Sequence, residues 1–550
     1  MEQRVCKVSG TPFTVSDEDI AILAKFDVPL PTLCPEERMR RRMAWRNERI
    51  LFYRKSSLDD TEILSMYRPN TPFPIYPSEY WFTDQWTAPF IDFDFSRPFY
   101  EQFKQLQNMV PRAALFNTQS TMQNSLYNNC AGYLKNCYMC FASDNNEDCY
   151  YGVFWKKSRT SIDGLVSIGN ELCYDCVNCS NCYNLKYSED CKNSRDSWFL
   201  SNCIGCSDCL LCTNLRRAQY CILNVQYSKE EYFKKIAELN FGKWSTIEML
   251  RAKFLELYRQ SPHPASFGTQ NDGSLGNALN NTKNAHMCFE SFNLEDCRYC
   301  TRIGDAKDCM DFTAWGSLGC ELMYECISCG DASYNCKFNA GCFVNCRNLE
   351  YCDNCYSSED CFGCIGLFKR QYCIFNKQYT KGEYESLKER IKGKMREEGI
   401  YGEFFPMAMS AIPYHDSIAQ DYYPLDESSA KSLGANWEEP KTVAKFPVTY
   451  VIPDSINDVT DDILNHTLVC AKSGKAFKLI RQELEYYRTH QIPVPQLCFD
   501  ERHLRRLSRT LPRTMFDSTC AKTGKPALSP FDPARGLTVW DREVFDQAFA

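Results

Sequence analysis

Thirty-four cysteines dominate the chemistry that this 550-residue chain could carry. Two runs with a thiol at every third position have the spacing of ligands for zinc or an iron–sulfur cluster; they are Cys173, Cys176, Cys179, Cys182 and Cys203, Cys206, Cys209, Cys212. The same frame continues through Leu185, Ser188 and Leu200, which supply no thiolate, and neither run ends like a bacterial ferredoxin motif. We therefore interpret the cysteines mainly as a stacked thiol interior, with metal clusters or soft-metal storage as the alternative.

The period of three indicates which element holds these thiols. All 13 cysteines from Cys137 to Cys221 share one frame, and serine, leucine, alanine and glycine fill much of the rest of it. Small or apolar side chains at this spacing are typical of the interior of a narrow β-solenoid with a corner between successive inward residues. Asn or Asp often precedes the cysteine, and both residues are favoured at corners of this kind. Coils of twelve and of eighteen residues both fit this phase.

The cysteine-rich middle of the chain is duplicated. Residues 135–149 return as 283–297, and residues 219–229 return as 371–381. The frame slips between Cys309 and Cys320, which predicts a bulge or loop insertion in the second copy. Apolar residues at helical spacing in 229–239, 246–258 and 383–396 predict helices after each copy, which we expect to cap the open solenoid ends.

The two ends of the chain are also copies of one module. Cys6, Ser9, Cys34 and Glu37 of the first match Cys470, Ser473, Cys498 and Glu501 of the second. A structural zinc ribbon carries four cysteines or histidines at such places, so both modules resemble degenerate ribbons. The candidate metal ligands are Cys6, Cys34, Glu37, Cys470, Cys498, Glu501 and Cys520. Zinc is the expected cofactor if these sites bind one; the alternative is a ribbon without metal, held by packing.

A basic stretch follows each predicted ribbon. Arginines mixed with aromatic residues are typical of helices that contact RNA, and the candidates are Arg38, Arg41, Arg42, Arg46, Arg502, Arg505 and Arg506. A solvated helix face paired with the acidic segment 454–462 explains the same pattern.

Composition limits the classes of protein that fit. Hydrophobic residues make up 44% of the chain and aromatic residues 14%, enough for real cores, and no run of about 18 apolar residues predicts a membrane span. The first residues lack the features of a signal peptide, so we expect a cytoplasmic protein with free thiols. A net charge of −7 argues against a chain that binds nucleic acid over its whole surface.

Together these patterns predict a mainly β protein. We expect two tandem Cys-rich β-solenoid repeats with helical caps, flanked by two related degenerate zinc-ribbon-like α+β modules. The predicted domains are the first module with its basic helix and aromatic segment (1–110), solenoid copy 1 with its cap (111–262), copy 2 with its cap (263–400), a linker (401–465) and the second module (466–550).

Several motifs add a resemblance to a known family. They are Cys-x-x-Ser-Gly at 6–10, Val-Pro-Leu-Pro-Thr-Leu-Cys-Pro at 28–35, Asp-Phe-Asp-Phe-Ser-Arg-Pro-Phe at 92–99, Lys-Asn-Cys-Tyr-Met at 135–139 and Tyr-Gly-Glu-Phe-Phe-Pro at 401–406. With them, nearly the whole chain resembles the Cys-rich, zinc-ribbon-containing proteins of reduced-genome bacterial lineages. Those relatives usually carry a second cysteine in each knuckle, where this chain has Ser9 and Glu37. The resemblance implies no established activity, and the CoA-transferase-like label of some relatives has no acidic nucleophile to support it here.

The sequence carries no catalytic signature. It lacks a phosphate-binding glycine loop, a nucleophile elbow, a His-Glu-x-x-His motif and a dinucleotide fingerprint, and no catalytic residue is predicted. We expect a non-enzymatic binding or scaffold protein with a protein or RNA partner, without a membrane partner or a small-molecule substrate. A thiol-rich metal-binding or storage protein and an enzyme of unrecognised type are the alternatives.

Overall fold

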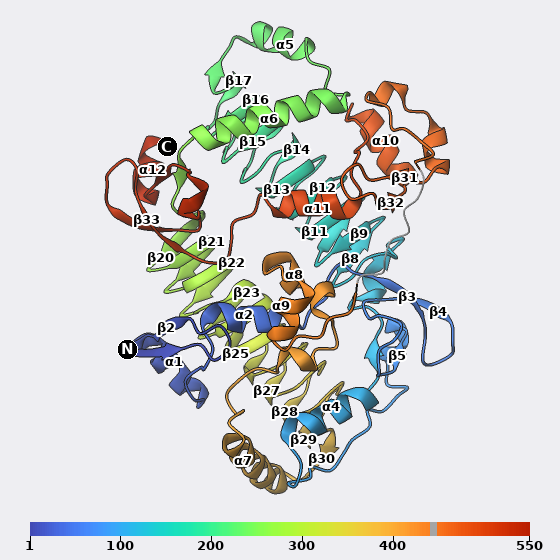
Figure 1. Cartoon of the computed structure of the whole chain (residues 1–550), viewed down its shortest axis with the longest axis vertical. Helices are drawn as coiled ribbons and strands as arrows, with labels where there is room; N and C mark the ends of the chain where they lie inside the picture. The colour runs from blue at the N-terminus through green and yellow to red at the C-terminus, as the bar shows by residue number, and fades with distance from the viewer. Residues whose placement is uncertain (440–447, 550) are drawn as a thin grey trace. The chain divides into compact units, whose positions relative to one another are not determined.

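The computed structural model describes residues 1–439 and 448–549, which fall into two compact units. Unit 1 comprises residues 1–115, 266–439 and 512–515, and unit 2 comprises residues 116–265, 440–511 and 516–550. Each unit therefore combines one terminal module with the cysteine-rich copy that is more distant from it in the sequence. Figure 1 shows this in the colours of unit 2, where teal strands of the first copy carry red and orange helices.

Unit 2 is built on a 12-stranded sheet whose strands follow one another in nearly sequential order. All neighbouring strands pair in parallel except the last two, which form a hairpin. The strands are β7 (Met122–Gln123), β8 (Gly132–Lys135), β9 (Tyr138–Phe141), β10 (Asp144–Glu147), β11 (Tyr150–Lys156), β12 (Ile162–Ile168), β13 (Tyr174–Ser180), β14 (Tyr183–Lys186), β15 (Arg195–Ser201), β16 (Ser207–Thr213), β17 (Gln219–Ile222) and β18 (Val225–Gln226).

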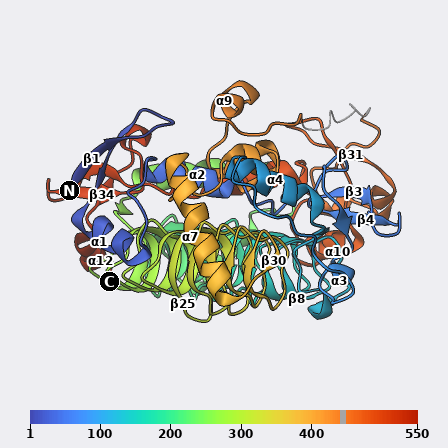
Figure 2. The ribbon, with the colours of Figure 1, turned by 90° about the horizontal axis from the view of Figure 1, so that it is seen from below.

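Unit 1 contains the corresponding 11-stranded sheet, which also ends in an antiparallel hairpin. Its strands are β20 (Gly268–Asp272), β21 (Leu275–Lys283), β22 (His286–Glu295), β23 (Thr301–Lys307), β24 (Met310–Trp315), β25 (Cys320–Cys329), β26 (Tyr334–Lys337), β27 (Arg347–Glu350), β28 (Glu359–Phe362), β29 (Gln371–Ile374) and β30 (Lys377–Gln378). Figure 2 shows the successive strands of this sheet stacked on one another.

The parallel pairing advances by twelve residues at each step in unit 2. Ile162 pairs with Tyr174, and Tyr174 with Lys186. We call each twelve-residue step a rung; of the two coil lengths that the sequence allowed, the structure has the shorter one. In unit 1 Met310 pairs with Tyr324, two residues beyond this step, which confirms the slip expected between Cys309 and Cys320.

Each rung has four corners, because every third residue adopts the left-handed conformation. In one rung these residues are Asp175, Asn178, Asn181 and Asn184, with φ between 51° and 53°. Asn and Asp accept this conformation at lower cost than most residues. Their side chains also join neighbouring rungs, since Asn178 Nδ2 donates to Asp190 Oδ1 at 3.1 Å and Asn184 Nδ2 to Asp196 Oδ1 at 2.8 Å.

The cysteines of the frame are buried inside the rungs. Cys173, Cys176, Cys179 and Cys182 occupy the four inward positions of one rung and form no disulfide. A thiol at these positions donates to the preceding corner and to the next rung, as Cys182 Sγ does toward the carbonyls of Ser180 (3.3 Å) and Cys191 (3.5 Å). The interior therefore accepts cysteine, serine and asparagine because each can bond the backbone that surrounds it.

The terminal modules each contain two similar hairpin knuckles followed by helices. The first module has β1 (Glu2–Val5), β2 (Pro12–Val15), α1 (Asp17–Phe26), α2 (Pro35–Met43), β3 (Phe52–Lys55), β4 (Glu62–Ser65), β5 (Ile75–Tyr76), α3 (Ser78–Trp81), α4 (Phe99–Met109) and β6 (Arg112–Ala113). The second has β31 (Leu468–Val469), β32 (Ala476–Phe477), α10 (Arg481–Thr489), α11 (Phe499–Leu507), β33 (Phe516–Thr519), β34 (Pro526–Ser529), β35 (Val539–Trp540) and α12 (Arg542–Ala548). In unit 2, β35 pairs with β19 (His263–Pro264).

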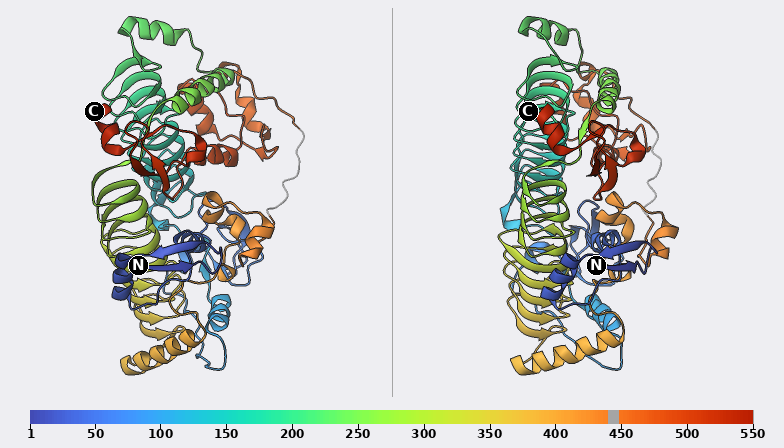
Figure 3. Two further views of the ribbon diagram at one scale, coloured as in Figure 1. Left: turned by 60° about the vertical axis from the view of Figure 1, so that its left-hand side comes forward. Right: turned by 90° about the vertical axis from the view of Figure 1, so that its left-hand side faces the viewer.

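Helices follow both copies, as expected. They are α5 (Lys229–Ala237) and α6 (Trp244–Gln260) after the first copy and α7 (Lys381–Glu397) after the second. Capping boxes start α5 at Ser228 and α7 at Thr380. Figure 3 shows α7, in orange-yellow, across the end of the yellow strands. Helix α6 instead lies over β15 and β16, where Phe254 packs on Phe199 at 5.8 Å, so it covers a side of the stack and not its end.

The segment expected as a linker, 401–465, is structured over much of its described length. It contains α8 (Ile418–Tyr422) and α9 (Glu427–Ser432), and Tyr414 and Ile418 are buried against Met39 and Met43 of α2. Residues 440–447 of this segment lie outside the described residues. Of the described helices, none combines the length and the apolar character needed to cross a membrane.

Candidate functional site

In each unit, one cluster of buried charged side chains joins the module to the sheet. In unit 2, Arg502 Nη1 and Arg506 Nη1 of α11 contact the two carboxylate oxygens of Asp163, at 2.7 and 2.8 Å. In unit 1, Arg38 Nε and Arg42 Nη1 of α2 contact those of Asp311, at 2.7 and 3.1 Å. Both aspartates are left-handed corner residues of the rungs. The same geometry thus occurs once in each unit.

A second acid on the next rung extends each cluster. Arg509 Nη2 lies 2.9 Å from Asp175 Oδ1 in unit 2, and Arg41 Nη2 lies 3.1 Å from Glu325 Oε1 in unit 1. Burial by itself raises the pKa of Asp175, but the charges of Arg509, Arg505 and Arg251 outweigh it and lower that pKa to about 2. The Asp175 carboxylate is therefore ionised at neutral pH and pairs with these arginines as a full charge.

The third acid of each cluster belongs to the module. Glu483 of α10 accepts hydrogen bonds from Arg502 Nη1 (3.0 Å) and from the hydroxyl of Tyr151 (2.9 Å) in unit 2. Asp19 of α1 accepts one from the hydroxyl of Tyr299 (3.1 Å) in unit 1. Buried ion pairs add little net stability but are costly to break singly, so these clusters fix how each module lies on its rungs.

The arginines predicted to contact nucleic acid are the residues of these clusters. Arg38, Arg41, Arg42, Arg46, Arg502 and Arg506 are all buried, with Arg42 0% and Arg506 1% exposed. Arg46 bonds Glu48 at 2.7 Å, and Arg505 reaches Glu248 at 3.3 Å. The sequence suggested that these arginines form an exposed basic face. That expectation is wrong, because their guanidinium groups are paired with carboxylates of the rungs and modules. The acids that they contact in the described residues, such as Asp311, Glu325, Asp163 and Glu248, lie outside the acidic segment 454–462. Binding of nucleic acid stays a prediction.

The candidate metal ligands are divided among separate knuckles. Cys6 and Cys34 share the first with Ser9, whose Oγ lies 3.9 Å from Cys34 Sγ, and Cys470 and Cys498 share the equivalent one with Ser473, at 3.7 Å. Glu37 bonds Arg40 (2.7 Å) and Glu501 bonds Lys472 (2.9 Å), so both carboxylates have cationic partners. Cys520 lies in the second knuckle of its module, where its Sγ accepts from the Asp541 amide at 3.2 Å.

The buried thiols bond the backbone within a rung and of the next rung. The Cys179 thiol donates to the carbonyls of Val177 (3.4 Å) and Ser188 (3.7 Å). Burial raises the pKa of the Cys288 and Cys336 thiols well above the ordinary value, which keeps them protonated as donors. Within residues 1–439 and 448–549, no group of three or more Cys, His, Asp or Glu side chains could hold a metal ion. Metal storage stays a prediction.

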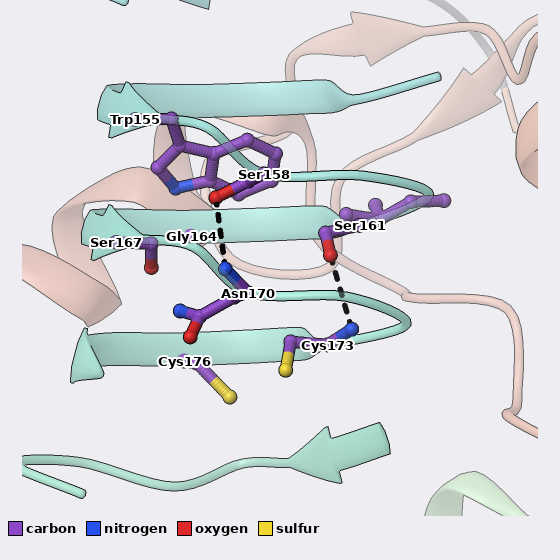
Figure 4. A pocket seen from close by; sticks show the side chains of 9 residues that line it. Trp155, Ser158, Ser161, Gly164, Ser167, Asn170, Cys173 and Cys176 are labelled. Carbon is purple, nitrogen blue, oxygen red and sulfur yellow. Dashed lines mark hydrogen bonds between the residues drawn. The ribbon is translucent and has the colours of Figure 1, made fainter. Parts of the chain in front are cut away.

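One rung departs from this pattern and encloses a small cavity. Trp155 occupies an inward position, and Gly152 and Gly164 leave the space that its ring fills. Figure 4 shows the residues below it, where Ser158 Oγ accepts from the Asn170 amide at 3.3 Å and Ser161 Oγ from the Cys173 amide at 3.1 Å. The cavity has no room for a water molecule, so the interior is filled by side chains.

An exposed row of side chains, which we call the charged ladder, is nearly the same in both units. Its members are directly paired between neighbouring rungs. In unit 2 they are Lys135, Glu147, Arg159, Glu171, Tyr183, Arg195, Ser207 and Gln219, and in unit 1 Lys283, Glu295, Lys307, Glu321, Tyr334, Arg347, Glu359 and Gln371. Tyr183 and Tyr334 are 44% and 39% exposed.

The sequence patterns missed the acids of the clusters and the ladder. Asp163 and Asp311 differ in no local feature from the other corner residues, and only their pairing with a distant module marks them. The ladder was detectable in principle, because its residues recur every twelve positions in both copies, but this requires the coil length. Each module has a second knuckle, at Ser56 or at Cys520, with the same turn as the first. In the first knuckle the Gly10 amide donates to the Cys6 carbonyl, and in the second the Asp60 amide donates to the Ser56 carbonyl. The sequence patterns missed this relation in the first module because Ser56 stands where the first knuckle has Cys6.

Comparisons with known proteins give little. The chain matches no protein-family model and no curated protein. Among solved structures, one similar chain is a Desulfovibrio desulfuricans protein provisionally described as an acetyltransferase; it is 10% identical, with a TM-score of 0.11, over 50% of this chain and 81% of that one. A likeness of this size supports no conclusion about fold or activity.

Proposed function

We propose that this protein is a non-enzymatic binding or scaffold protein whose two β-solenoids each present the charged ladder to a protein partner. The rungs with parallel twelve-residue pairing and four corners support the solenoid assignment. The paired knuckles support an origin of the modules in ribbon folds that have lost part of their ligand set. In this proposal the modules are fixed covers of the solenoids.

The observation that carries the proposal is the agreement of the ladder between the two copies. Lys, Glu, a cation, Glu, Tyr and Arg follow in the same order along both ladders, and every member remains partly or fully exposed. The row that contains Asp144, Lys156 and Ile168 in unit 2 has Phe292, Gly304 and Gly316 at the matching places in unit 1. Exposed residues are not retained for packing, so a shared order indicates a shared binding role.

The chemistry of the ladder favours protein over RNA. Charges of opposite sign alternate from rung to rung, at the strand spacing of about 4.8 Å. Side chains of a protein partner can match both signs, whereas a polyanion would meet Glu147 and Glu171, or Glu295 and Glu321, beside the first two cations of each ladder. The exposed tyrosine in the middle of each ladder adds the kind of residue that concentrates binding energy in protein interfaces.

Charge reversal in both ladders tests this proposal. We expect the double variant Arg195→Glu/Arg347→Glu to lose partners that the wild-type chain retains from a lysate of its source cells after chemical cross-linking. Its matched control is Arg217→Glu/Lys369→Glu, which reverses exposed cations at equivalent corners of the two units, outside the ladder. A protein retained by the wild type and by the control, but lost from the ladder variant by at least tenfold, supports the proposal.

The contrary result is equally plain. If every retained protein binds wild type, ladder variant and control alike, the ladder is not a binding surface and the proposal fails. Ribonuclease treatment of the lysate separates the RNA version, since loss of all retained protein after digestion would make RNA the partner. Circular dichroism of the three proteins checks that the substitutions leave the fold unchanged.

A further inference from the structure

The two solenoids end in nearly identical hairpins. Residues 219–227 match residues 371–379, and Cys221 pairs with Gln226 as Cys373 pairs with Gln378. The residues at the tip are Leu223, Asn224 and Val225 in unit 2 and Phe375, Asn376 and Lys377 in unit 1. Asn224 and Asn376 both have left-handed backbones and accept, through Oδ1, from an amide of the preceding rung at 2.9 and 2.8 Å.

In unit 1 an extended aromatic segment covers this tip. Phe375 is fully buried, with its ring 5.5 Å from that of Phe93 and 5.3 Å from that of Phe99. Two main-chain bonds hold the segment in place: the Ile91 amide donates to the Phe375 carbonyl (3.2 Å), and Asn376 Nδ2 donates to the Pro89 carbonyl (2.9 Å).

Charge completes this contact. Lys377 of the tip forms an ion pair with Asp92 of the segment. The segment thus binds through aromatic rings, main-chain hydrogen bonds and one charge. Helix α4, which begins at Phe99, lies beside β28, β29 and β30 in Figure 1 and continues the same cover.

In unit 2 the equivalent tip is open. Leu223 is 47% exposed and Val225 54%, although both are apolar. The apolar surface extends to α5, where Phe233 is 44% exposed and packs on Tyr220 of the same hairpin at 5.9 Å. Neighbouring apolar side chains left in water at a site whose duplicate is covered mark an interaction surface.

We propose that this open tip, formed by Leu223, Asn224, Val225 and Phe233, binds an extended aromatic segment of a partner protein in the way that residues 89–93 bind the tip of unit 1. Leu223 fills less space than Phe375 and leaves room for an aromatic ring. Val225 stands where unit 1 has Lys377, so the segment carries an apolar residue at the place of Asp92. The amide of Asn224 faces the main chain of the segment.

A peptide with the sequence of the unit 1 segment is the probe for this site. It spans residues 88–97 (Ala-Pro-Phe-Ile-Asp-Phe-Asp-Phe-Ser-Arg), carries a fluorophore, and is made in its natural form and with Asp92→Val. By fluorescence anisotropy with the full chain, we expect the Asp92→Val peptide to bind at least tenfold more tightly than the natural one. The substitution Leu223→Asp should remove this binding, and a Phe93→Ala peptide should lose it as well.

A reversal of preference excludes non-specific adhesion. The variant Val225→Lys recreates the charge of Lys377, so it should prefer the natural Asp92 peptide over Asp92→Val, a switch that partial unfolding would not produce. Equal binding of both peptides to wild type and Val225→Lys, or binding unchanged by Leu223→Asp, overturns the proposal, as does no binding by any pair. The ladder variant Arg195→Glu/Arg347→Glu should bind the peptide normally, so failure of this site and failure of the proposed function are separate results.

Discussion

A left-handed aspartate anchors each module to its sheet. Asp163 (φ 59°) and Asp311 (φ 55°) stand at corners where the side chain leaves the rung, and both are almost completely buried, at 1% and 0% exposure. Each meets two arginines one helical turn apart on α11 or α2, a spacing that places both guanidinium groups on one face. Because desolvation offsets much of the Coulomb attraction, the pairs specify orientation more than they add stability.

Removal of one arginine should therefore be costly. We expect Arg506→Met to lower the free energy of unfolding of unit 2 by about 3–5 kcal/mol, since the buried Asp163 loses one of its two arginine partners and Arg502 alone must then neutralise both Asp163 and Glu483. The first transition in urea denaturation, followed by tyrosine and tryptophan fluorescence, measures this change. The exposed Arg159, whose side chain is 71% accessible, is the control: Arg159→Met should change stability by less than about 0.5 kcal/mol.

The double variant Arg506→Met/Asp163→Asn separates charge from packing. If an unpaired charge causes the loss, removing the carboxylate as well should restore at least half of it. A double variant as unstable as the sum of both single variants would show that the cluster acts through shape alone.

At the scale of the element, the rung of Trp155 accommodates its large inward side chain because glycine stands at two inward positions beside it. A Cβ at Gly164 would lie 2.3 Å from the Trp155 ring, and one at Gly152 would lie 2.6 Å from it. A similar close contact lies outside the inward frame in unit 1, where the partly exposed Phe292 covers Gly304, whose Cβ would lie 2.2 Å from its ring. A large side chain in one rung therefore takes up the space that a glycine leaves free in the next, an exchange of volume between stacked rungs.

The substitution Gly164→Ala tests this exchange. We expect it to destabilise unit 2 by about 1–3 kcal/mol because the added methyl group overfills the interior. Trp155→Ser gives this rung the residue that its neighbours carry at Ser143 and Ser167, so Gly164→Ala should cost much less in that background. Gly382→Ala in α7, where a Cβ meets nothing within 4 Å, should be neutral or stabilising in thermal unfolding. An equal cost with and without Trp155 would contradict the packing argument.

Features that depend on residues close together in the sequence could be predicted, whereas features that depend on contacts between distant residues could not. The frame of three marks inward positions because a corner repeats locally every third residue, so the burial of Cys173 or Cys326 could be predicted from spacing. The coil length could not, since residues twelve and eighteen apart share that phase. The basic stretch was misread as a surface because the acids that neutralise it, such as Asp311, lie far away in the sequence.

At the scale of the whole molecule, each terminal module is paired with the sheet of the copy more distant from it in the sequence. Residues of α1 and α2 pack on the second copy, with the Phe26 ring stacked on Tyr324 at 5.2 Å and Arg298 bonded to Asp19. The first copy, although nearer to α1 and α2 in the sequence, packs instead with α10 and α11 of the second module. There the ring of Tyr174 lies 5.7 Å from that of Tyr487. A consecutive arrangement of domains would give the opposite neighbours.

Two truncated chains distinguish these arrangements by hydrogen exchange. A chain that begins at residue 51 lacks α1 and α2, so amides of β23, β24 and β25 should exchange faster, while those of β11, β12 and β13 keep their protection. A chain that ends at residue 515 lacks β35, and faster exchange should appear at His263 and its neighbours in unit 2 with β23, β24 and β25 unchanged. Faster exchange in β11, β12 and β13 of the first chain would mean that the N-terminal module stabilises the copy next to it in the sequence. The pattern of two separate responses would instead show that each unit is built from distant parts of the chain, which requires the sheet of the first copy to wait for a module made after it.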